Sequence, residues 1–82
     1  MDQLEFMREA SKKWLKGRRE RGNPLDAPFE GNPAFELKEE MLDSRNYLDE
    51  MLKQGIITEE SHYHAVNAVF SLALLADTAA RR

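Results

Sequence analysis

The chain has 82 residues, no cysteine and a formal net charge of −3, and 41% of its residues are hydrophobic. A chain this short is expected to form one domain over residues 1–82, and without cysteine it has neither a disulfide nor a thiolate metal site. The negative net charge argues against nucleic-acid binding by bulk charge, so no DNA partner is expected. The longest apolar run, residues 65–80, is broken by Asn67, Ser71 and Asp77. We therefore expect no membrane span and a cytoplasmic protein.

The first helix is predicted to begin at Asp2, because Asp2 and Glu5 have the spacing of a capping box. The segment 22–24, Gly-Asn-Pro, predicts its end. One side of this helix has the residues that are expected to face the core: Leu4, Met7, Ser11, Trp14 and Leu15. The loop that follows has two apolar residues that predict an ordered path, Leu25 and Phe29.

A second helix is predicted over residues 33–54. Asn32 and Pro33 form the pair that commonly opens a helix, a capping side chain followed by proline in the first turn. Gly55 follows as the residue that can adopt the left-handed backbone conformation after the last turn. These signals place both ends of the helix without reference to the rest of the chain.

Thr58 is predicted to cap a third helix that continues to Ala80, with Glu59 and Glu60 in its first turn. Apolar residues cover most of its circumference and leave a narrow polar stripe: Asn67, Ser71 and Thr78. Two other helices cannot cover such a helix on all sides, so a second subunit is expected to do so. The predicted fold is all-α, a three-helix subunit that forms a helical bundle by homo-oligomerisation. The apolar patch expected at the subunit contact is Val69, Leu72, Leu75 and Ala76.

The strongest chemical signal is a set of carboxylates on one face of the second predicted helix. At about 100° per residue, five acids fall in one arc with Asn46 and Tyr47: Glu36, Glu39, Glu40, Asp43 and Glu50. Carboxylates three and four residues apart repel one another unless a cation or a basic partner neutralises them. This face predicts a Mg²⁺ site or a contact with a basic partner, and an ordinary solvated surface is the alternative.

The run from Glu36 to Leu48, ELKEEMLDSRNYL, resembles the acidic helix of the MazG-like all-α nucleotide pyrophosphatases. It is also similar to a run found in small phage proteins. In the enzyme family, acidic pairs on two successive helices hold Mg²⁺ against the phosphates of a nucleotide. The resemblance implies that four side chains are metal ligands: Glu36, Glu39, Glu40 and Asp43. Both acidic pairs lie on one helix here, and the third helix adds only Asp77 as an interior acid, so a complete catalytic set would have to form across subunits.

A basic cluster at the end of the first helix is the second chemical signal. It surrounds Trp14 and consists of Lys12, Lys13, Lys16, Arg18, Arg19 and Arg21. These cations are suited to bind phosphate, and the indole of Trp14 is suited to stack on a nucleotide base. The position of Trp14 on the apolar side of the helix nevertheless favours a role in the core. The arginines could instead meet the acidic face of a neighbouring second helix, which would make the charge matching structural.

Two histidines open the third helix and point to different sides of it. His62 is expected to be a core histidine with a partner, whereas His64 lies near the polar stripe and could contact a ligand. Since no nucleophile motif and no phosphate-binding glycine loop is present, the sequence favours binding over catalysis.

The function predicted first is a non-enzymatic protein that captures a phosphorylated, nucleotide-like small molecule at a subunit interface. The residues predicted to contact it are Trp14, Lys16, Arg18, Arg19, Arg21, Tyr47 and His64. The likeness to small phage proteins implies that the ligand is a signalling nucleotide of a bacterial host's defence. A Mg²⁺-dependent nucleotide pyrophosphatase is the first alternative, and an acidic-faced inhibitor or adaptor is the second. No cofactor is predicted apart from a possible Mg²⁺.

Overall fold

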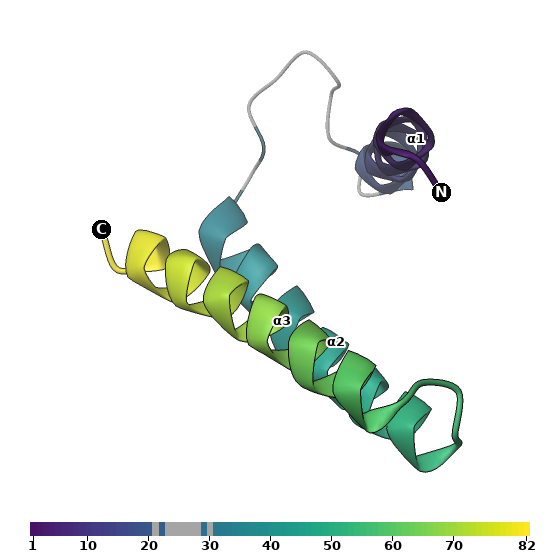
Figure 1. Ribbon diagram of the computed structural model, residues 1–82. Helices are drawn as coiled ribbons and strands as arrows, with labels where there is room; N and C mark the ends of the chain where they lie inside the picture. Colours follow the sequence, from purple (N-terminus) through teal and green to yellow (C-terminus); the bar gives the residue numbers. More distant parts are fainter. Residues whose placement is uncertain (21, 23–28, 30) are drawn as a thin grey trace. The chain divides into compact units, whose positions relative to one another are not determined.

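The computed structural model describes residues 1–20, 22, 29 and 31–82, and in this part the chain forms three helices and no strand (Figure 1). The helices are α1 (Gln3–Glu20), α2 (Pro33–Lys53) and α3 (Glu59–Ala80). The all-α, three-helix prediction is confirmed, whereas assembly into a bundle and the extent of one domain over residues 1–82 stay predictions. Two compact units are distinguished, Met1–Gly31 and Asn32–Arg82. In the described residues no helix has the length and apolar character needed to cross a membrane.

The ends of α2 are fixed by the residues that the sequence singled out. The side-chain oxygen of Asn32 accepts hydrogen bonds from the backbone N–H groups of Ala34 and Phe35, at 3.0 and 3.4 Å. Pro33 occupies the first turn, where its missing N–H costs nothing. Gly55 has φ of +71°, a conformation that an L side chain rarely adopts, and the helix ends just before it at Lys53. The predicted bounds are confirmed to within one residue.

The first turns of α1 and α3 are capped in the same way. Oδ1 of Asp2 accepts from the backbone N–H of Glu5 at 2.8 Å, and Oγ1 of Thr58 accepts from that of Ser61 at 3.1 Å. Each cap supplies an acceptor for a backbone N–H that has none within the helix. Both predicted starts are therefore confirmed, and α3 ends at Ala80 as predicted.

Helices α2 and α3 run antiparallel, side by side, and form a hairpin (Figure 1). The residues of α3 on the side toward α2 are all buried or half-buried and recur at intervals of four and three: His62, Val66, Val69, Ala73, Ala76 and Ala80. We call them the α2-facing stripe. Their spacing is that of a helix that packs lengthwise along one neighbour. Three alanines at the end of the stripe keep the side chains small where the helices meet.

Very little of the hairpin is buried. Among the hydrophobic residues that the structure describes, Ala76 alone counts as buried, at 2% exposed, while Leu72 and Leu75 are 45% and 64% exposed. The exposure of the two leucines agrees with the patch expected from the sequence. Val69 and Ala76, which were assigned to the same patch, lie instead in the α2-facing stripe, because they are displaced around the helix from the leucines.

Candidate functional site

The five residues of the acidic face, Glu36, Glu39, Glu40, Asp43 and Glu50, lie on the side of α2 opposite to α3. All five carboxylate residues of this face are exposed, and Tyr47 among them is 72% exposed. In the described parts of the chain, no three or more His, Cys, Asp or Glu side chains are arranged to hold a metal ion. The structure therefore does not bring Glu36, Glu39, Glu40 and Asp43 together as a ligand set within one chain. Side chains on one convex helix diverge unless a second element supplies ligands, so Mg²⁺ binding here stays a prediction.

Asp77 on α3 is partnered by two cations, one of them on α2. Its Oδ1 accepts from Nζ of Lys38 on α2 at 2.8 Å, and its Oδ2 lies 3.1 Å from a guanidinium nitrogen of Arg81. The hydrogen bond from Lys38 holds the pKa of Asp77 below its ordinary value of 3.8, against the opposing effect of burial, and the charge of Arg81 lowers it further. The carboxylate expected from the sequence to be an interior acid is thus a link between the end of α3 and the beginning of α2.

His62 makes the equivalent link near the turn between the two helices. Its Nε2 donates to Oδ1 of Asp49 at 2.8 Å, and its side chain is 19% exposed. This hydrogen bond lowers the pKa of Asp49 from its ordinary value, and the charges of Arg45 and Lys53 act in the same direction. The prediction that His62 is an inward histidine with a partner is confirmed.

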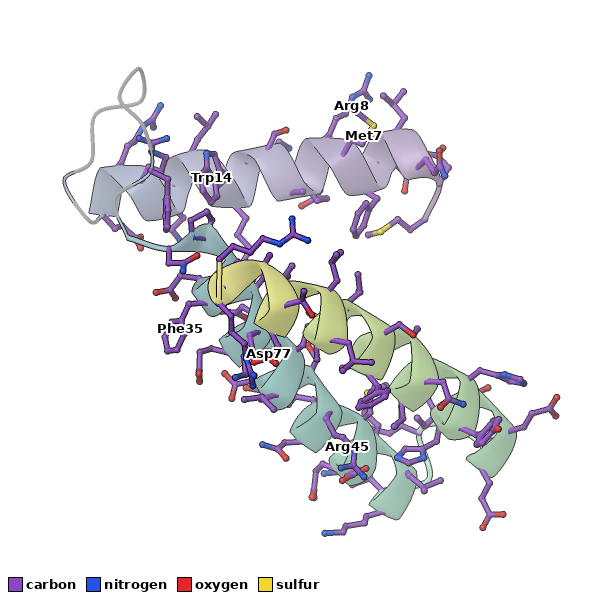
Figure 2. The ribbon with its side chains drawn as sticks, turned by 90° about the vertical axis from the view of Figure 1, so that its left-hand side faces the viewer. Met7, Arg8, Trp14, Phe35, Arg45 and Asp77 are labelled. Atoms are coloured by element: carbon purple, nitrogen blue, oxygen red, sulfur yellow. The ribbon has the colours of Figure 1, made fainter. Side chains whose placement is uncertain are left out.

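The aromatic residue of the basic cluster is exposed but has two side-chain neighbours. Trp14, near the end of α1 (Figure 2), has its ring centroid 5.3 Å from that of Phe29 and 5.7 Å from the guanidinium carbon of Arg18. Arg18 is 6% exposed, and Trp14 is 48% exposed. The indole differs from the prediction, since it was expected to be a core residue. A single helix cannot bury an indole, so Trp14 packs on Phe29 and stacks with the cation four residues on.

The other described cations of the basic cluster are exposed: Lys12, Lys13, Lys16 and Arg19. Nζ of Lys16 lies 3.9 Å from a carboxylate oxygen of Glu20, a loose pair between exposed side chains. The three lysines line a shallow hollow along α1 with Met1, Phe6, Glu9 and Ala10. Phe6 was not among the residues predicted to bind a ligand, although its spacing from Ala10 and Lys13, four and seven residues, places all three on one helix face.

The other predicted ligand residues are not brought together. Tyr47 lies on the acidic face of α2, and His64 lies on the exposed side of α3, where its Nε2 is 3.9 Å from a carboxylate oxygen of Glu60. The ring of Tyr63 meets that of His64 edge-on, with centroids 5.5 Å apart. Arg21 lies outside the described residues. Most of the predicted ligand residues that the structure describes therefore lie on α1.

Comparisons with known proteins found no match to this chain among protein-family models, curated proteins or solved structures. The similarity of residues 36–48 to the acidic helix of the MazG-like enzymes therefore rests on the quoted residues alone. Function has to be argued from the geometry of α1 and of the α2–α3 hairpin.

Proposed function

We propose that the chain is a non-enzymatic binding protein that captures a phosphorylated, nucleotide-like small molecule with α1 and acts as an assembly of identical subunits. The observation that carries the proposal is the hollow on α1, whose lining combines three lysines and one acid with apolar side chains: Lys12, Lys13, Lys16, Glu9, Met1, Phe6 and Ala10. Such a hollow offers cations to phosphate and an aromatic face to a base. The likeness to small phage proteins adds a signalling nucleotide of a host defence as the ligand class.

Three of the four charged side chains that line the hollow are cations, and this excess of positive charge favours an anion. In the part of the chain that the structure describes, Lys12, Lys13 and Arg19 have no ion-pair partner, and the contact of Lys16 with Glu20 is long at 3.9 Å. Four exposed cations within eight residues repel one another, and a bound phosphate relieves this repulsion. A small ligand agrees with the net charge of −3, which would oppose the close approach of a long polyanion.

Assembly is the second part of the proposal, and the poor burial of the hairpin supports it. Large apolar side chains of α3 remain exposed, and unpartnered apolar surface of this kind is typical of a protein–protein contact. A mass spectrum of the protein purified under native conditions tests both parts, because it reports the number of subunits and any retained nucleotide together.

The sharper test is a calorimetric titration of the purified protein with adenosine triphosphate. We expect the affinity for adenosine triphosphate to fall as salt is added, and uncharged adenosine not to bind. The double variant Lys13→Ala with Lys16→Ala should lose affinity by roughly tenfold or more. The matched control is Arg45→Ala with Lys53→Ala, which removes the same charge from α2. Equal losses in the two double variants would show only a general charge effect and would defeat the proposal.

The exposed carboxylates of α2 favour one second candidate, an acidic surface that docks on a basic protein. No metal-ligand set is formed in the described residues, and the five acids face away from α3. Exchange of Glu39 and Asp43 for Asn should then abolish salt-sensitive capture of a basic partner without changing nucleotide binding by α1. If that exchange abolishes nucleotide binding instead, the acids belong to the nucleotide site.

A further inference from the structure

Helix α3 has a second set of residues at the spacing of a helix contact. We call it the outer stripe, and its members recur at intervals of four and three: Ser61, Ala65, Ala68, Leu72, Leu75 and Ala79. Each member directly precedes a member of the α2-facing stripe, so the two stripes lie about 100° apart around the helix axis. A helix in a four-helix bundle contacts its two neighbours at about this angle. One neighbour of α3 is α2, and the outer stripe is exposed apart from the half-buried Ala65.

We propose that the outer stripe packs against the outer stripe of a second copy of the chain, with the two α3 helices antiparallel about a two-fold axis at the level of Phe70. This inference rests on the assembly part of the proposed function and names its surface. About this axis, Ala65 lies opposite Leu75 of the partner subunit, and Ala68 lies opposite Leu72 of the partner subunit. A small side chain faces a large one at each of these levels, which lets the helices interdigitate.

The charges of α3 identify the occupant as a second copy and set its direction. Residues 65–76 contain no charged side chain, and the charges are placed at the two ends of the helix. Glu60 directly precedes the outer stripe, and Arg82 follows the end of α3 at Ala80 by two residues. In the antiparallel arrangement Glu60 lies at the level of Ala80 of the partner subunit, two residues before Arg82 of the partner subunit, so opposite charges lie close together at both ends. A parallel arrangement would place like charges together. The helix is therefore complementary to itself in one direction only.

The neighbouring leucines provide a matched test of the surface. Leu74 and Leu75 are 51% and 64% exposed, but Leu74 points about 100° away from the outer stripe. Sedimentation equilibrium of the full chain over a range of concentrations gives the dissociation constant of the dimer. We expect Leu72→Gln and Leu75→Gln each to raise it by roughly tenfold or more, and Leu74→Gln to leave it within about twofold. Circular dichroism of each variant verifies that the helices are kept.

Charge exchange tests the direction of the contact without touching its apolar centre. In the antiparallel dimer, Glu60→Lys alone and Arg82→Glu alone should each weaken association, and the two together should restore it, because opposite charges then meet again. A parallel dimer would not be weakened by either single exchange, since its like charges already face one another. Absence of the restoration overturns the antiparallel contact.

The outcomes separate this inference from the proposed function on which it rests. If the wild-type chain is a monomer at all concentrations, both the inference and the assembly part of the proposed function are wrong. If it assembles but Leu74→Gln dissociates it while Leu75→Gln does not, the outer stripe is the wrong surface and assembly stands. Nucleotide binding by α1, measured on the same samples, is independent of either result.

Discussion

Removal of the cap of α3 should lower the stability of the hairpin by a predictable amount. In Thr58→Ala, the backbone N–H of Ser61 loses the Oγ1 acceptor that lies 3.1 Å away. Loss of an N-cap hydroxyl typically costs about 1 kcal/mol. The site is exposed, so water replaces part of the lost bond and the cost should not exceed this value. For a domain of this size, 1 kcal/mol corresponds to a fall in melting temperature of roughly 4–8 °C.

The assay is thermal unfolding followed by the helical signal in circular dichroism. Wild type and variants must be compared at one protein concentration, since association would make the melting temperature depend on concentration. Thr58→Ser is the matched control, because it keeps a hydroxyl at the same place and should melt close to wild type. Two results would contradict this role of the cap. One is a melting temperature of Thr58→Ala equal to that of wild type, and the other is a melting temperature of Thr58→Ser as low as that of Thr58→Ala.

Two further predictions concern carboxylates. The folded-state pKa of Asp77 lies below its ordinary 3.8, so its ion pairs stabilise the folded chain above that pH and the contribution is lost as the pH falls through the lower folded value. The urea midpoint of wild type should thus exceed that of Asp77→Asn at neutral pH, and the two midpoints should converge in acid. A difference between the midpoints that does not change with pH would contradict the role of Lys38. Incubation with Mg²⁺ and a nucleoside triphosphate should release no pyrophosphate, and a captured nucleotide should be recovered intact on denaturation. Metal-dependent release that disappears in Asp43→Asn would favour the pyrophosphatase.

The ends of the helices could be predicted from the sequence because the signals act over three or four residues. Asn32 with Pro33, Gly55 and Thr58 each fix the local backbone whatever the rest of the chain does. The partner of His62 could not be predicted in the same way. It is Asp49 on another helix, and the meeting of the two depends on the register of α2 along α3.

The apolar pattern of α3 left a different question open. The pattern showed that nearly the whole circumference of α3 is apolar, but it could not show against which side of α3 the helix α2 packs. Val69 and Leu72 therefore appeared equivalent, and the structure separates them as the side toward α2 and the exposed side. On α1, the contact of Trp14 with Phe29 depends on the path of the chain after the helix and could not be predicted, whereas the four-residue spacing of Trp14 and Arg18 was a signal for their contact.

The double partnership of Asp77 has a consequence for motion at the open end of the hairpin. The last turn of a helix normally frays, because its final carbonyl groups have no partners within the helix. Here the two oxygens of one carboxylate hold Lys38 of the neighbouring helix and Arg81 of the residues that follow the last turn of α3. Unwinding of that turn would have to break both contacts. Amide hydrogens near Ala80 should consequently exchange with solvent more slowly than the end of an isolated helix would allow, and Lys38→Met should speed their exchange.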